Sequence, residues 1–447
     1  MVCVDSMNRM RKERNKVEDS RYSKIGKVYN GFSTFQLKSV LIKNDAGDWG
    51  TEPNENAVGI IRSTNFNNNG KLDLSDIAYR TLSPQKLEEK RLSSSDILVE
   101  RSGGSDTQPV GRVGYVTDEI TNKKLAFANF IQRISLDETV DAKFVYYCLQ
   151  QMYEMGITAS MQFQTTGIRN LDWKFYLKTY LPKPTKEDQT TIANILSKVD
   201  ETIASVQNSI AAAEQLKKSL MQNLLTGKMK PDGTFRTPDE FYIDEKFGKV
   251  PIGWEVKKLK DIAQIQRGKF GHRPRNDERF YNGDFPFVQT GDVVESVFFL
   301  KGASQSLNAL GASVSRSFPV NTIIMTIAAN IGFVALTRYE VFFPDSLIGI
   351  NAKEDVINPS YLLLHLMRYK NILDAQATES AQKNINYSNL RPLPILFPTK
   401  KEEQLQITNK VIAIFSEIDS KKTKIKILEQ LKKSLMQNLL SGKINIL

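Results

Sequence analysis

The side chains with the clearest chemistry are arginine, lysine, asparagine and glutamine residues in loops rich in turn-forming residues. The densest of these loops, residues 266–276, holds four cationic side chains. Arginine can bond guanine twice, asparagine or glutamine can bond adenine, and lysine neutralises phosphate. Each loop alone is also typical of an ordinary solvated turn. The candidate nucleic-acid contacts are Arg62, Asn65, Arg101, Ser102, Arg112, Arg169, Arg267, Lys269, His272, Arg273, Arg275, Asn276, Gln289 and Lys383.

Residues that could catalyse a reaction are few. Residues 358–361 read Asn-Pro-Ser-Tyr, close to the Asn-Pro-Pro-Tyr loop of adenine methyltransferases. No glycine-rich cofactor loop accompanies them, and an N-cap followed by proline explains the pattern. The carboxylates of residues 238–246 are too tightly spaced, in too flexible a segment, for a nuclease triad. His272 and His365, the two histidines, lie in different contexts. We expect no catalytic residues, no metal site and no cofactor.

Composition fits a basic globular protein. A length of 447 residues predicts two or more domains. The N-terminus is charged and lacks the apolar core of a secretory signal, and no apolar run is long enough for a membrane span, so we expect a cytoplasmic protein. Cys3 and Cys148, the two cysteines, favour neither disulfides nor a thiolate metal site. A net charge of +11 attracts polyanions, although it could also serve solubility.

A duplicated peptide dominates the organisation of the chain. Residues 214–228 read EQLKKSLMQNLLTGK, and residues 429–443 repeat them with Ser441 in place of Thr226. Each copy ends a helical pattern of about 40 residues with apolar positions at coiled-coil spacing. The stripes are Ile192, Leu196, Val199, Ile203, Val206, Ile210, Ala213, Leu216, Leu220 and Ile407, Val411, Ile414, Ile418, Ile425, Leu428, Leu431, Leu435.

The ends of these two helices also carry signals. Thr185 and Thr399 are expected to be N-caps, and Gly227 and Gly442 to end the helices as C′ residues. Because each stripe must be covered, we expect the helices to pack antiparallel about a pseudo-twofold axis.

Identical polar residues outside the stripe predict that one kind of partner binds twice, although recent duplication would also explain their identity. These candidate partner contacts are Lys217, Lys218, Gln222, Asn223, Lys432, Lys433, Gln437 and Asn438.

Two blocks of unlike sequence but similar pattern alternate with the helices. Each shows two β-rich regions, a short helix and a polar loop. The sequence predicts an α+β protein with two mixed α/β domains joined by two long antiparallel coiled-coil helices. The segments are a charged N-terminal extension (1–30), a first variable domain (31–183), a central helix (184–228), a linker (229–253), a second variable domain (254–397) and a distal helix (398–443).

This layout resembles the specificity subunit of type I restriction–modification systems. The resemblance rests on the paired LKKSLMQNLL[TS]GK helix ends, the helix starts at residues 182–189 and 398–404, and the Val-Pro-Ile-Gly-Trp-Glu sequence at residues 250–255. The first block lacks the Gly-Trp-Glu opening. The match covers nearly the whole chain after about residue 30.

The resemblance implies a non-catalytic subunit. Each variable domain would be a target recognition domain that reads one half of a bipartite site in double-stranded DNA. The helices would set the half-site separation and dock two methyltransferase (M) subunits, with restriction/translocase (R) subunits joining the full complex. Two alternatives stay open: a coiled-coil scaffold whose flanking domains bind proteins without sequence-specific DNA recognition, and an intrinsic nuclease or methylase.

Overall fold

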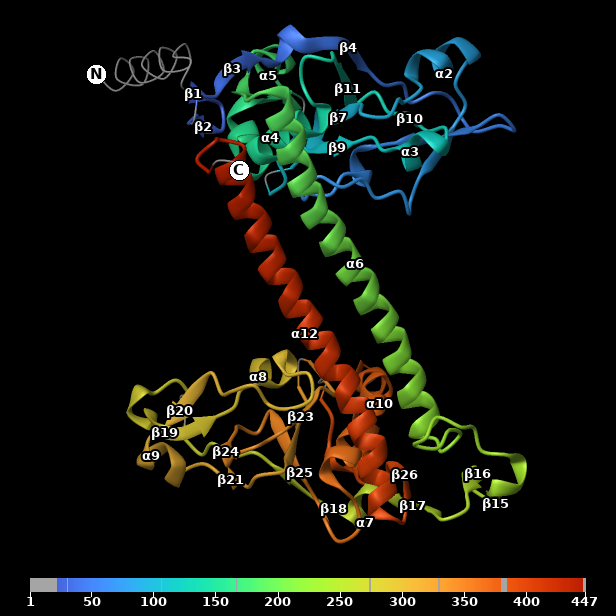
Figure 1. Ribbon diagram of the computed structural model, residues 1–447. Helices are drawn as coiled ribbons and strands as arrows, with labels where there is room; N and C mark the ends of the chain where they lie inside the picture. The colour runs from blue at the N-terminus through green and yellow to red at the C-terminus, as the bar shows by residue number, and fades with distance from the viewer. Residues whose placement is uncertain are drawn as a thin grey trace. The chain divides into compact units, whose positions relative to one another are not determined.

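The computed structural model describes residues 22–29, 31–105, 107–165, 167–272, 275–328, 330–378 and 384–444 (Figure 1). Cys3, Arg273, Lys383 and most of the N-terminal extension lie outside the described residues. The chain divides into two compact units. Unit 1 comprises Met1–Ser205 with Ile425–Leu447, and unit 2 comprises Val206–Lys424. Each unit therefore holds one variable domain, the start of one long helix and the end of the other.

The variable domain of unit 1 is built on an antiparallel sheet covered by a helix. The strands, in sheet order, are β4 (Leu41–Ala46), β11 (Ile131–Leu136), β7 (Ile97–Glu100) and β9 (Val113–Tyr115). Helix α4 (Ala142–Glu154) packs its apolar residues on this sheet. A second sheet joins β5 (Val58–Ile61) in parallel to β10 (Ala126–Phe127) and antiparallel to β6 (Ala78–Arg80).

The variable domain of unit 2 repeats this topology with unrelated residues. Its main sheet runs β18 (Ala263–Arg267), β25 (Leu347–Ala352), β22 (Thr322–Thr326) and β23 (Val334–Leu336), and α10 (Pro359–Thr378) packs on it. Its second sheet again contains one parallel pair, between β19 (Tyr281–Phe287) and β24 (Val341–Phe342), and adds β20 (Gln305–Leu307) and β21 (Ser317–Phe318). The predicted α+β class with two similar domains is confirmed.

Each domain is closed by pairing its first strand with the strand before the long helix. In unit 1, β3 (Ser33–Gln36) pairs with β14 (Tyr180–Lys183); in unit 2, β17 (Trp254–Lys258) pairs with β26 (Pro394–Pro398). Strand β3 is therefore the equivalent of β17 in unit 1, but it has no residue like Trp254 of β17. The segment predicted as a linker contains a hairpin of β15 (Phe241–Asp244) and β16 (Gly248–Pro251).

The two long helices lie close to the predicted ranges. Helices α6 (Lys186–Leu224) and α12 (Lys401–Leu439) each contain 39 residues. The hydroxyl of Thr185 accepts a hydrogen bond from the backbone of Asp188 at 3.1 Å, which confirms this N-cap. The expected cap at Thr399 is wrong by one residue, because α12 begins at Lys401 and the Thr399 hydroxyl donates to the Gly253 carbonyl. After both helices a glycine is left-handed, Gly227 with φ of 66° and Gly442 with φ of 72°.

Within each unit the two helix segments run antiparallel. In unit 2, the Lys421 ammonium donates to the hydroxyl of Ser209 at 2.6 Å, and that of Lys217 lies 4.9 Å from the centre of the Phe415 ring. Residue numbers thus rise along α6 as they fall along α12. In unit 1, Asp200 of α6 pairs with Lys432 of α12 at 2.8 Å.

The predicted stripe is wrong near the end of each helix. Leu216 and Leu431 were expected inside the seam, yet 50% and 45% of their surface is exposed. Lys217 and Lys432, expected on the outside, contact the neighbouring helix instead, and Lys432 is buried. In both copies, therefore, the aliphatic part of the lysine side chain packs between the helices, and the leucine before it is left exposed.

A buried glutamine joins each long helix to its domain. The Gln189 side chain accepts from the backbone of Asp141 at 2.8 Å, and Gln404 accepts from that of Asn358 at 2.7 Å. Asp141 and Asn358 are the N-caps of α4 and α10, and the Asn358 side chain accepts from the backbone of Ser360 at 2.9 Å. The interpretation of residues 358–361 as a capped helix start is therefore confirmed.

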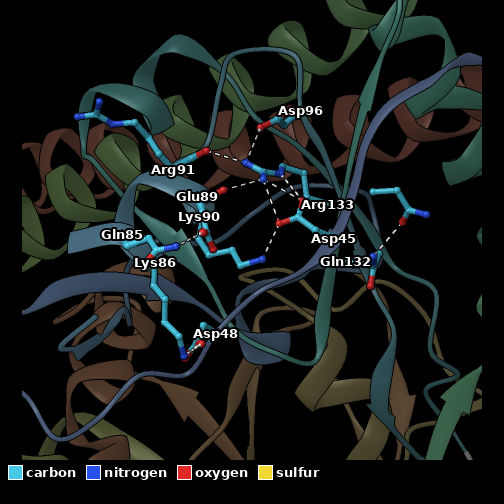
Figure 2. Close-up of polar contacts among 11 residues, drawn as sticks. Asp45, Asp48, Gln85, Lys86, Glu89, Lys90, Arg91, Asp96, Gln132 and Arg133 are labelled. Carbon is cyan, nitrogen blue, oxygen red and sulfur yellow. Dashed lines mark hydrogen bonds and ion pairs between the residues drawn. The ribbon is translucent and has the colours of Figure 1, made fainter. Parts of the chain in front are cut away.

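A buried arginine holds a surface helix against the sheet of unit 1, as Figure 2 shows. The Arg133 guanidinium donates to both carboxylate oxygens of Asp45, at 2.9 and 3.0 Å, and to the carbonyls of Glu89 and Arg91. Lys90 reaches the same carboxylate at 2.7 Å. These bonds fix α2 (Pro84–Lys90) and the turn after it.

Candidate nucleic-acid interface

Three of the loops predicted from sequence meet in the first variable domain. The Ser63 hydroxyl donates to the Ser102 carbonyl at 3.3 Å, and the Ser102 hydroxyl donates to the Asn170 side chain at 2.6 Å. Ser102 lies in β8 (Ser102–Gly104), which pairs with β13 (Ile168–Leu171) of a hairpin completed by β12 (Gln162–Thr165). The loops around Arg62, Arg101 and Arg169 therefore form one continuous surface.

A buried ion pair supports this surface from below. The Arg112 guanidinium is 8% exposed and donates to both carboxylate oxygens of Glu100, at 2.8 and 2.7 Å. It also donates to the carbonyls of Ser63 and Phe66. Burial raises the pKa of the Glu100 carboxyl, and the hydrogen bonds from Arg112 oppose that rise. Arg112 therefore fixes the Ser63 loop to β7.

Three candidates thus differ from the expectation of a groove-facing side chain. Arg112, Asn65 and Ser102 are all buried. The Asn65 amide donates to the carbonyls of Asp73 and Asp76, at 2.8 and 3.0 Å, because its loop closes around it. These three residues shape the surface. Arg101 is exposed on it, whereas Arg169 is half-buried and Arg62 is half-buried in a pair with Asp76 at 2.6 Å.

Three candidates of the second domain line a cavity of about 230 Å³. Arg275, Asn276 and Gln289 line it together with aromatic side chains, and the Gln289 amide donates to Gln305 at 2.9 Å. An adjacent cavity of about 420 Å³ shares Asn276, Tyr281 and Gln305 with the first. This concave surface therefore combines flat aromatic rings with amide donors and acceptors.

The other described candidates of this loop, Arg267, Lys269 and His272, line neither cavity. Asp345 accepts from Arg275 through its carboxylate and from Arg267 through its carbonyl, so it ties the end of β18 to the loop. Lys269 is exposed. His272 lies 3.0 Å from the Asp277 carboxylate, whose pKa is lowered chiefly by its hydrogen bond with Arg279.

The duplicated helix ends present matching outer faces. Lys218 and Lys433 are exposed, as are Gln222 and Gln437. Asn223 and Asn438 are half-buried and hydrogen bond to the serine one turn earlier, at 3.3 Å in both copies. Leu216 and Leu431 are exposed as well, but on another side of each helix, because residues two apart in a helix do not share a face. Sequence reasoning missed these leucines because coiled-coil spacing assigned them to the seam.

Two further buried titratable groups, His365 and Cys148, lie in the helices that cover the main sheets. Burial lowers the pKa of His365 in α10 to about 3 and raises the pKa of the Cys148 thiol in α4. In the described part of the chain, no group of three or more histidine, cysteine, aspartate and glutamate side chains is placed to hold a metal ion. None of its helices has the length and apolar character needed to span a bilayer.

Comparison with known proteins relates the chain to one family. The type I restriction modification DNA specificity domain matches twice, over residues 29–215 and 251–432. The chain is 21% identical over 441 residues to the putative type I restriction enzyme MjaX specificity subunit of Methanocaldococcus jannaschii, which covers 96% of this chain and 98% of that protein. It is 28% identical over 200 residues to the HindI specificity subunit of Haemophilus influenzae, which covers 44% of this chain and 42% of that protein.

A solved structure shares the fold. The S subunit of a type I restriction–modification system from M. genitalium matches with a TM-score of 0.57 at 14% identity, over 95% of this chain and all of that one. Each copy of the matched domain begins near the first strand of a recognition domain and ends inside a long helix. The chain therefore belongs to the family of type I restriction–modification DNA specificity subunits.

Proposed function

We propose that this chain is the DNA sequence-recognition subunit of a type I restriction–modification complex. Each variable domain reads one half of a bipartite site in double-stranded DNA, and the paired helices set the distance between the halves. The chain itself catalyses no reaction, and it acts in the cytoplasm, where its DNA lies. The observation that carries the proposal is the repeated backbone topology with unlike surface residues in the two domains.

The chemistry of the two surfaces supports DNA as the ligand. The surface of unit 1 offers Arg101 and Arg169, and that of unit 2 offers Arg275, Asn276 and Gln289 beside the exposed Lys269. Arginine and amide side chains suit base edges, and lysine suits phosphate. A scaffold that bound only proteins would not need these residue types on two unlike surfaces. The net charge of +11 favours a polyanionic ligand as well.

The duplicated helix faces support two identical partners. We assign them to two methyltransferase subunits, each docked on one face of exposed lysine and glutamine. Restriction/translocase subunits would join the complex thereafter. The identity of the two faces fits this assignment, because the same partner surface must bind at both.

Replacing Asn276 and Gln289 with alanine is expected to relax the half-site read by the second domain and leave the other half-site unchanged. Each amide that pairs with a base contributes about 1–3 kcal/mol of discrimination. The measurement is methylation mapping in cells that express the chain with its methyltransferase subunits. The matched control is Gln264→Ala, which removes an exposed amide of the same domain outside the cavity. Relaxation of both half-sites, or of neither, would contradict the proposal.

A further inference from the structure

The β12–β13 hairpin of the first recognition domain exposes two large apolar side chains. Half of the Phe163 surface and 42% of the Ile168 surface are accessible. Phe163 pairs with Asn170 across the hairpin, and Thr165 pairs with Ile168. Side chains alternate between the faces of a strand, and directly paired residues share a face. Phe163, Ile168 and Asn170 therefore lie on one face, next to the point where the hairpin turns.

This hairpin is firmly attached to its domain. Asn170 accepts the hydrogen bond from Ser102 at 2.6 Å, which links β13 to β8. Met161 and Leu171, at the base of the hairpin, are buried in the core under α4. The backbone of Asp172 donates to the Met161 carbonyl at 2.7 Å and closes the base. The hairpin that carries Phe163 and Ile168 is therefore held rigidly against the domain.

The residues around the pair suit DNA better than a protein partner. No aspartate or glutamate occurs between Met155 and Leu171. Asn170 lies on the same face as the pair, and Gln164 and Arg169 lie on the opposite face of the hairpin. Stable protein interfaces need about 800 Å² of surface on each partner, far more than two side chains offer. Proteins that bend DNA insert phenylalanine or isoleucine between base pairs, beside arginine and amide side chains in the minor groove.

Resting on the proposed function, we propose that Phe163 and Ile168 form a wedge that enters the minor groove and unstacks one base step at the first half-site. The wedge would add specificity through the deformability of that step, which differs between sequences. Gln164 and Arg169, on the opposite face of the hairpin, would contact the phosphate backbone beside the groove while the apolar pair enters.

The test compares the Phe163→Ala/Ile168→Ala double variant with the wild-type chain, each in complex with its methyltransferase subunits, on the mapped target. We expect specific affinity to fall by about tenfold, the loss typical of one stacked aromatic side chain, together with a smaller DNA bend by end-to-end fluorescence transfer. A mismatch at the wedged step should restore affinity, because its stacking is already weakened. Ile42→Ala, which truncates an isoleucine of the same domain that is 65% exposed, should change nothing.

Further variants and outcomes distinguish the wedge from a protein contact. Phe163→Leu, which keeps an apolar side chain, should bind and bend DNA nearly as well as the wild type. A double variant with unchanged affinity and bend overturns the wedge. A double variant that no longer assembles with the methyltransferase subunits overturns it in favour of a protein contact. If the wild-type complex itself lacks sequence-specific binding, the proposed function fails and the wedge fails with it.

Discussion

Replacing Arg112 with methionine is expected to destabilise the first recognition domain by about 3–5 kcal/mol, because breaking a buried ion pair leaves an uncompensated charge. The Glu100 carboxylate would lose its two hydrogen bonds from Arg112, and the carbonyls of Ser63 and Phe66 would lose theirs. The pKa of Glu100 is already raised by burial and would rise further. The loop of Ser63 would separate from β7, and reading of the first half-site would fail with it.

Hydrogen exchange of the full chain measures this effect for each unit separately. Amides of β7, β9 and β11 should lose protection corresponding to about 3–5 kcal/mol, whereas those of β22, β23 and β25 should keep theirs. Arg101→Met is the matched control, since it removes an exposed arginine near the same loop and should change stability by less than about 0.5 kcal/mol. A double variant, Glu100→Leu/Arg112→Met, should recover part of the loss, because an apolar pair carries no buried charge. Equal stability of Arg112→Met and the wild type would contradict the structural role of the pair.

The role of Arg112 shows where sequence reasoning reached its limit. The local sequence around an arginine that follows a glycine-rich loop is the same whether the arginine contacts DNA or a buried carboxylate. The available signal was Glu100, which follows three apolar residues in the strand Ile97–Glu100. A charged residue in a buried strand needs a partner. Which residue is that partner depends on the pairing of β7 with β9. This pairing brings Arg112 beside Glu100, which lies 12 residues earlier in the chain.

The unlike cores of the two variable domains also limit what the sequence can predict. Arg133 stands opposite Leu98 in the sheet of unit 1, and the equivalent place in unit 2, opposite Ile324, is taken by Gly349. A side chain on Gly349 would collide with Phe318, which stacks on Phe343 at 3.9 Å. The two domains thus support one backbone with unlike cores. The sequence predicted their common order of strands and helices but could not predict which polar residues each core would bury.

Lengthening both long helices by four residues is expected to lengthen the unread DNA spacer and leave both half-sites intact. The insertions would follow Ala211 in α6 and Ser420 in α12. The contacts Ser209–Lys421 and Glu214–Lys422 show that these positions face each other. Four helical residues add about 6 Å, and a base pair rises about 3.4 Å. The spacer should therefore grow by about one or two base pairs, and methylation mapping would detect the change.

The matched control places the same four residues between Asp232 and Gly233. This exposed turn lies in the segment after α6, where the Lys230 backbone donates to the Thr234 carbonyl at 2.8 Å. Extra residues there should leave the spacer unchanged, since they lengthen no helix. A spacer that stays constant when both helices grow would show that the helices do not measure the DNA.

The helices themselves were the most predictable part of the chain. Apolar spacing, the Thr185 cap and the terminal glycines located them within a few residues, because helical signals are local. The exchange of Leu216 for Lys217 in the seam was not predictable, because it depends on Phe415, nearly 200 residues away. The same exchange in the second copy leaves Leu431 exposed.

The most direct measurement is methylation mapping of DNA from cells that contain the wild-type chain and its methyltransferase subunits. We expect one asymmetric motif made of two short specified half-sites, separated by unspecified base pairs of constant number. A continuous motif, half-sites at variable spacing, or sequence-independent methylation would contradict it.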